Sequence, residues 1–146
     1  MVYRVFVEKK EGLDNEARAL LLLETNGLIK VDPAAGLAAT KNDIIENPLN
    51  LEIVELEAAQ LARSLQDVDI AVINGNYALQ AGLNVADALA VEDASGEAAQ
   101  YYANLIACRN GDENSEKITA LVNALKTDAV KAFITETYNG AVQAIF

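Results

Sequence analysis

Three polar side chains have the residue types and positions that a binding site for a small zwitterion needs. Arg18 is predicted to lie in the first turn of a helix, where free backbone N–H groups and the helix dipole favour an anion. A guanidinium there can hold a carboxylate through two parallel hydrogen bonds. Asn74 ends a buried-looking strand, and Asn104 lies within a second apolar run. An amide can donate and accept at once, which suits a zwitterionic ligand.

Each of these residues also has an ordinary structural explanation. Arg18 can pair on the surface with Asp14 or Glu11. Asn74 can cap the helix that follows it, and the amide of Asn104 can bond to neighbouring backbone. The residue pattern alone leaves both explanations open.

The sequence gives little support for catalysis or for metal or cofactor binding. The sequence has no histidine, the commonest general base near neutral pH and the commonest zinc ligand, and it has no glycine-rich phosphate loop or GxSxG motif. The acidic pairs Glu55/Glu57 and Glu92/Asp93 are interpreted as solvated charges, and Cys108, in an apolar run, as a buried structural thiol. We therefore expect no catalysis, no metal site and no cofactor.

Composition limits the partners. The 146 residues are 52% hydrophobic, enough for one domain with a real core, and carry a formal net charge of −11. An acidic surface argues against nucleic acid and anionic lipid. No apolar run approaches the roughly 20 residues that a membrane span requires. The charged, alternating residues Met1–Lys10 predict a strand and not a signal peptide.

Short apolar strands alternate with helical stretches, which predicts an α/β fold of three layers around a mostly parallel sheet. We expect Asp69–Asn74 to be a strand buried on both faces. The other predicted strands are Tyr3–Glu8, Gly36–Ala39, Leu51–Leu56 and Tyr101–Arg109. The predicted helices run from Asp14 or Asn15 to Asn26-Gly27, from a Thr40 cap to Asn47-Pro48, and over Ala58–Leu65, Tyr77–Ala81, Ser115–Lys126 and Asp128–Tyr138. A change of pattern near residue 98 suggests a substructure boundary.

Several long segments carry a family resemblance. They are Arg18–Glu24, Asn26–Lys30, Asp43–Pro48, Val54–Leu65, Val68–Ala78 and Glu136–Val142. In this order they resemble the NlpA/MetQ lipoproteins, the substrate-binding components of bacterial methionine ABC importers. The resemblance covers about residues 15–146.

The resemblance implies a type II periplasmic-binding-protein fold, in which two hinged α/β lobes close on one methionine. Residues 1–98 resemble the second lobe, and residues 99–146 resemble the strand and helices that return to the first lobe. Arg18 matches the arginine that pairs with the ligand carboxylate, and Asn74 and Asn104 match asparagines that hold the amino acid group. The implied function is non-enzymatic binding of methionine or a similar small amino acid, with an ABC permease as the family's partner.

The chain also departs from the family. A complete member begins with a lipoprotein signal and an anchoring cysteine, followed by a first lobe with aromatic residues and a histidine around the methionine side chain. Here the first fourteen or so residues differ, and Val5–Lys10 somewhat resembles the start of the purine-biosynthesis enzyme phosphoribosylformylglycinamidine synthase. This suggests a chimera joined near Asn15–Arg18 and only half of a methionine site. The family is extracytoplasmic and lipid-anchored, whereas this sequence, with neither signal nor anchor, is expected in the cytoplasm.

An alternative is a single-lobe scaffold that binds no ligand. Residues 99–146 would lack a first lobe to pack on, and unpaired strand edges and apolar helix faces favour self-association. We therefore expect a homo-oligomer, formed by swapping this segment or through an apolar interface.

Overall fold

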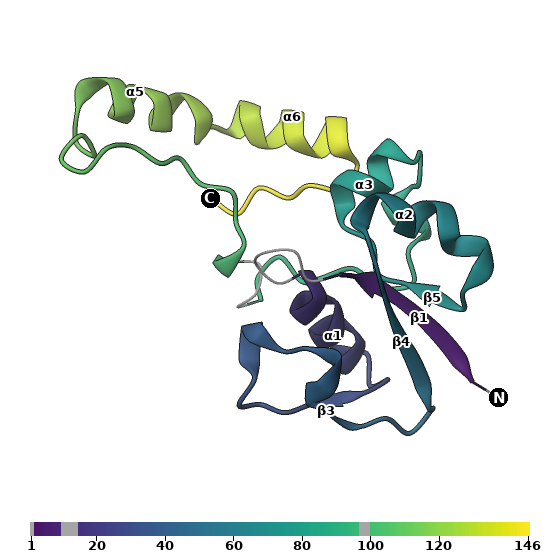
Figure 1. Ribbon diagram of the computed structural model, residues 1–146. Coiled ribbons are helices and arrows are strands. Elements are labelled where there is room, and N and C mark those ends of the chain that lie inside the picture. The colour runs from purple at the N-terminus through teal and green to yellow at the C-terminus, as the bar shows by residue number, and fades with distance from the viewer. Residues whose placement is uncertain (1, 10–14, 97–99) are drawn as a thin grey trace. The chain divides into compact units, whose positions relative to one another are not determined.

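The computed structural model describes residues 2–9, 15–96 and 100–146 (Figure 1). The chain divides into two compact units, Met1–Glu92 and Asp93–Phe146. The first unit contains the sheet, and the second contains two successive helices joined to an irregular segment (Figure 1). Each unit is described by itself.

The sheet of the first unit is built around its earliest strand. β1 (Tyr3–Glu8) lies between β4 (Leu51–Leu56) and β5 (Ile70–Ala71) and is parallel to both. The register places Val5 beside Ile53 of β4. These findings confirm the predicted parallel sheet and the two strands Tyr3–Glu8 and Leu51–Leu56.

The prediction for Asp69–Asn74 is wrong in length and burial. Only Ile70 and Ala71 form β5, and their side chains are half-buried. In the described part of the chain, β1 is the only strand that pairs with β5, so β5 lies at an edge of the sheet. The apolar sequence of residues 69–74 does not reveal this edge position, because the burial of a strand depends on which elements pack beside it.

One face of the sheet packs on α1 (Asn15–Thr25). Leu20 and Leu23 of this helix join Val5 and Val7 of β1 in the main apolar cluster. The chain leaves the helix through Gly27, whose φ of +72° lies in the left-handed region that glycine adopts without strain. This confirms the predicted helix, although Asp14, one of the two candidate caps, falls outside the described residues.

The opposite face of the sheet packs on α2 (Ala58–Leu61). Side chains alternate along a strand, so Phe6 points away from the face that Val5 and Val7 occupy. Leu61 is fully buried without belonging to the α1 cluster. Helices therefore cover both faces, as a three-layer α/β fold requires. The predicted helix Ala58–Leu65 is α-helical only over its first four residues and continues as the 3-10 helix η3 (Ala62–Asp67).

The connection between α1 and β4 corrects two predictions. Gly36–Ala39 is not a strand, because η1 (Gly36–Ala38) is a 3-10 turn that begins with φ +52° at Gly36. The helix predicted from Thr40 to Asn47-Pro48 is too long, although Thr40 is its cap, and the Asp43 carboxylate accepts from the Thr40 amide at 2.7 Å. The helix is only the 3-10 turn η2 (Lys41–Asp43). It ends at Asp43 because the next residues form β3 (Ile44–Glu46), which pairs antiparallel with β2 (Lys30–Val31).

Two short helices follow β5 within the first unit. α3 (Gly75–Gln80) begins directly after Asn74 and agrees with the predicted helix Tyr77–Ala81 to within a turn. η4 (Val85–Asp87) is a single 3-10 turn. The chain then runs without regular structure to Glu92, the last residue of this unit.

The second unit contains the two predicted C-terminal helices. In α5 (Glu116–Leu125) the Ser115 hydroxyl accepts from the Ile118 amide, and in α6 (Asp128–Tyr138) Thr127 makes the equivalent bond to the Val130 amide. Asn139 ends α6 in the left-handed conformation, with φ 46°. Across the described ranges, no helix is long and apolar enough to cross a membrane.

The strand predicted over Tyr101–Arg109 is wrong. Tyr101 is helical, and residues 103–109 have no regular structure. A strand needs a neighbour for its backbone N–H and C=O groups, and the described residues of the second unit contain no strand. The buried thiol predicted at Cys108 is wrong for the same reason, because the side chain of this irregular segment is exposed.

Candidate functional site

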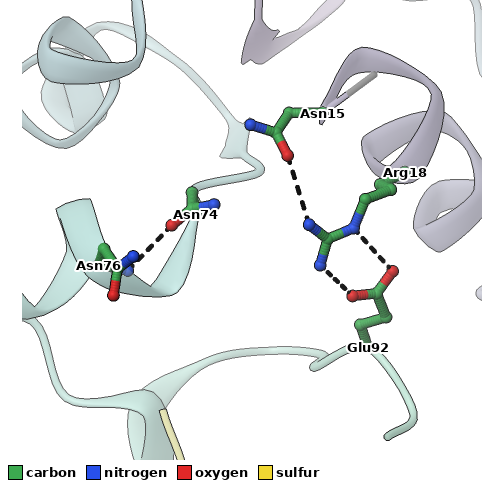
Figure 2. A network of polar contacts seen from close by, with 5 residues as sticks. All are labelled: Asn15, Arg18, Asn74, Asn76 and Glu92. Atoms are coloured by element: carbon green, nitrogen blue, oxygen red, sulfur yellow. Dashed lines mark hydrogen bonds and ion pairs between the residues drawn. The ribbon is translucent and has the colours of Figure 1, made fainter. Parts of the chain in front are cut away.

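Arg18 already holds a carboxylate. It lies in the first turn of α1, where its Nε donates to Oε1 of Glu92 at 3.2 Å and its Nη2 pairs with Oε2 of the same residue (Figure 2). Its Nη1 donates to Oδ1 of Asn15 at 3.3 Å. The two contacts to Glu92 are parallel, which is the bidentate geometry that suits a guanidinium and a carboxylate. The acceptor belongs to the chain itself, so the contact of Arg18 with a ligand carboxylate stays a prediction.

The Arg18–Glu92 ion pair is partly open to solvent. The two side chains are 28% and 29% exposed, so water weakens their attraction. An ion pair in such a setting stabilises a fold by about 1 kcal/mol or less. Asp14 and Glu11, the surface partners considered for Arg18, lie outside the described residues.

Glu92 was missed as a site residue, since it was interpreted as a solvated charge. It lies 74 residues from Arg18 along the chain. No local spacing rule connects residues so far apart, and only the fold brings them together. The one sequence signal was its place in an acidic pair just before a turn, which does not identify a partner.

Asn74 performs the structural role considered for it. It caps α3, because its Oδ1 accepts from the backbone amide of Asn76 at 3.0 Å. Its side chain is half-buried. Figure 2 shows the amide nitrogen turned away from Asn76 and towards the side of Arg18. Capping therefore uses the oxygen of this amide and leaves its donor facing the region of the Arg18 guanidinium.

The structure places the three predicted site residues in two different units. Arg18 and Asn74 belong to the first unit, where they follow the carboxyl ends of β1 and β5. Asn104 belongs to the second unit and is exposed in the irregular segment 103–109. The strand expected to carry it is absent there, and a common site that includes Asn104 stays a prediction.

A buried carboxylate fixes the helix turn that carries Arg18. Glu16 is only 2% exposed, and its Oε1 accepts from the backbone amide of Lys41 at 2.8 Å. Negative charge in the first turn of a helix is also favoured by the helix dipole. Glu16 thus anchors the start of α1 to η2 and sets the position from which Arg18 projects.

The other acidic pair, Glu55/Glu57, forms ion pairs with two lysines. Glu55 accepts from the Lys41 ammonium, and this hydrogen bond is the main cause that raises the pKa of Lys41. Glu57 lies 3.6 Å from the Lys9 ammonium, with both side chains about half exposed. Among residues 2–9, 15–96 and 100–146, no group of three or more His, Cys, Asp or Glu side chains is placed to hold a metal ion.

Two hollows lie elsewhere in the first unit. One of about 360 Å³ lies beside the carboxyl end of β4, and one of about 370 Å³ lies between α2 and α3. Neither is lined by Arg18 or Asn74. The polar groups of the candidate site are therefore separate from both of these hollows.

Solved structures share this fold. The chain is similar to a nutrient binding protein from Burkholderia cenocepacia bound to methionine, with 44% identity and a TM-score of 0.82 over 99% of this chain and 59% of that one. It is also similar to the substrate binding protein of a methionine transporter from Streptococcus pneumoniae, with 37% identity and a TM-score of 0.79 over 99% and 55% of the two chains. These matches confirm an α/β periplasmic-binding-protein fold. At 99% coverage of this chain, the matches include β1.

Sequence comparison agrees with this. The D-methionine-binding lipoprotein MetQ of Salmonella typhimurium is 46% identical over an alignment of 129 residues that covers 86% of this chain and 46% of that protein. The corresponding protein of Escherichia coli is 45% identical over the same shares. The chain spans about half the length of these curated relatives. A sequence model of the NlpA lipoprotein family matches residues 11–146. The chain therefore belongs to the NlpA lipoprotein family.

Proposed function

We propose that this chain binds methionine or a similar small amino acid, without catalysing a reaction, as part of the substrate-binding component of an ABC importer. Arg18 holds the ligand carboxylate, and Asn74 and Asn104 hold the rest of the amino acid group. The observation that carries this proposal is the bidentate contact of Arg18, which shows a guanidinium oriented to take a carboxylate. Relatives that are named for methionine binding and for a methionine transporter support the choice of ligand.

The proposed site is half of a two-lobed one. Residues 1–98 supply Arg18 and Asn74 from one lobe, and residues 99–146 supply Asn104 from a segment that belongs with the other lobe. The Arg18 side chain is 28% exposed and Asn104 is exposed, so water competes for both. A ligand that is not enclosed gains little from such contacts, and we expect a dissociation constant of about 1 mM or weaker.

A methionine titration of the isotope-labelled protein, followed by two-dimensional amide NMR, tests the proposal. We expect saturable shifts at the amides around Arg18, Asn74 and Asn104, with leucine as the comparison ligand. Arg18→Ala should abolish these shifts. The matched control is Arg4→Ala, because Arg4 also pairs with a glutamate, Glu52 at 3.1 Å, but on an exposed part of the sheet. If methionine binding were unchanged in Arg18→Ala, the proposed site would be wrong, because the ligand carboxylate would then be held elsewhere.

The second candidate function is that of a self-associating scaffold. The observation in its favour is that the second unit buries none of its described side chains, although α5 and α6 carry large apolar residues. Apolar faces of this kind are usually covered by a partner surface. Light scattering at micromolar concentration tests this: a dimeric or larger mass is expected, and a monomeric mass would contradict it. An oligomer with no response to methionine would favour the scaffold over the binder.

A further inference from the structure

We propose that Glu92 is an internal placeholder for the ligand carboxylate, so that a ligand must displace it from Arg18 before binding. This inference rests on the proposed function, because it concerns the same guanidinium. It assigns to Glu92 a role in setting the affinity of the site. The prediction is that the chain competes with its own ligand.

The geometry shows why Glu92 and a ligand carboxylate cannot both bind the same edge of Arg18. Glu92 places one oxygen on Nε and the other on Nη2 of Arg18, so it fills one complete edge of the guanidinium. Nη1 is engaged by the side-chain oxygen of Asn15 at 3.3 Å. A ligand carboxylate that binds this same edge needs the same pair of parallel bonds. Two carboxylates at one guanidinium would also repel each other, since a single positive charge compensates only one of them.

The position of Glu92 makes it displaceable. It lies after η4 in a stretch without regular structure, and its side chain is 29% exposed and belongs to no apolar cluster. Releasing it requires no helix or strand to break. A partly solvated pair of this kind contributes little to folding. The carboxylate can therefore exchange its place on Arg18 for water.

Attachment to the chain makes Glu92 an effective competitor. A tethered group acts at an effective concentration that is commonly in the millimolar range. A free amino acid with millimolar affinity therefore meets a competitor of similar strength. Removing that competitor should tighten ligand binding about three- to fivefold, the factor that corresponds to a partly exposed ion pair.

The test compares methionine binding to the wild-type protein, Glu92→Gln and the control Glu46→Gln. Glu92→Gln keeps the shape of the side chain and removes its charge. Glu46→Gln removes the same charge from an exposed pair with Lys30, so it controls for the change in net charge. Arg18 is monitored through its Nε–H signal. We expect Glu92→Gln to bind methionine about three- to fivefold more tightly than the wild type and Glu46→Gln to match the wild type.

A second probe separates this inference from the proposed function. Acetate carries only a carboxylate, and we expect it to shift the Arg18 Nε–H signal at lower concentration in Glu92→Gln than in the wild type. If neither the wild type nor a variant binds methionine but this acetate difference is present, the proposed function fails, while the competition of Glu92 with a carboxylate at Arg18 is supported. If methionine binds and Glu92→Gln binds it equally or less tightly, the placeholder is wrong and the proposed function stands. Absence of the acetate difference likewise overturns the placeholder.

A third variant covers the case in which Glu92→Gln does not fold. Glu92→Asp keeps the charge but shortens the side chain by one methylene, which prevents both oxygens from reaching Nε and Nη2 together. Its affinities for methionine and acetate should lie between those of the wild type and Glu92→Gln. Affinities equal to those of the wild type would contradict the proposed competition.

Discussion

The region from β1 to α2 and the second unit both contain helices with recognisable sequence patterns, but they differ in how many of their side chains are buried. All the buried apolar residues that the structure describes lie between Val5 and Leu61. In the second unit, α5 and α6 have hydroxyl caps at both starts, yet none of the described side chains is buried. The comparison shows that caps and periodicity are sufficient to define a helix, whereas a core requires a complementary surface.

The exposed apolar residues of the second unit make the contrast concrete. Leu121 and Leu125 of α5 are 44% and 42% exposed, and Phe133 of α6 is 60% exposed. Leu20 of α1, a residue of the same type as the first two, is fully buried against the sheet. The difference lies in what each helix packs on and not in the side chains themselves.

The largest effect is expected from breaking the core. Leu20→Ala should lower the free energy of unfolding by about 2–5 kcal/mol, because it leaves a cavity among tightly packed side chains. Leu121→Ala makes the same chemical change on an exposed helix face and should cost less than about 1 kcal/mol. Urea unfolding followed by circular dichroism measures both. Equal losses for the two variants would show that α5 is covered in solution and would remove the contrast.

A smaller effect is expected at a helix cap in the second unit. Thr127→Ala removes the acceptor of the Val130 amide and should destabilise the start of α6 by about 0.5–2 kcal/mol. No buried face supports this helix, so the first turn should fray and its amides should exchange faster with deuterium. Thr135→Ala is the control, since the Thr135 hydroxyl bonds to the Lys131 carbonyl inside the helix. Unchanged exchange at Val130 would mean that packing, not the cap, holds this turn.

The smallest effect concerns pH at the start of the second unit. The backbone amide and then the hydroxyl of Ser95 donate to Asp93, and these bonds lower the pKa of its carboxyl. A lowered pKa in the folded state stabilises the turn above the ordinary pKa of aspartate, and this contribution is lost as the pH falls through the folded value. Ser95→Ala removes the hydroxyl donor, so the Asp93 pKa should rise partway to its usual value. Carbon-detected NMR titration measures it, and an unmoved pKa would contradict the assignment.

Local signals explain which elements were predicted correctly. Alternation identified Tyr3–Glu8 and Leu51–Leu56, and the helical pattern of Asp128–Tyr138 identified α6, which Thr127 and Asn139 cap in the structure. In these places the deciding interactions lie within a few residues of one another. Sequence alone was therefore sufficient.

Non-local interactions explain the errors. Short apolar runs such as Asp69–Asn74 and Tyr101–Arg109 are compatible with a strand, but a strand forms only where a neighbour offers its backbone. At the candidate site, Arg18 was predicted to bind a ligand carboxylate, and this stays a prediction, because the carboxylate that it contacts in the structure belongs to Glu92. Its partner Glu92 could not be predicted, because the fold alone brings the two residues together.

The central place of β1 has a consequence for the order of folding. Tyr3 pairs with Leu51, and Val5 also pairs with Ile70, so β1 receives its two neighbouring strands only after most of the first unit has been synthesised. Contacts between residues so distant along the chain slow folding, since a long loop must close before the pairing stabilises it. Until then both edges of β1 are open to other chains. Aggregation during synthesis should therefore involve the unpaired edges of β1, and a chaperone that covers Tyr3–Glu8 would increase the yield of folded protein.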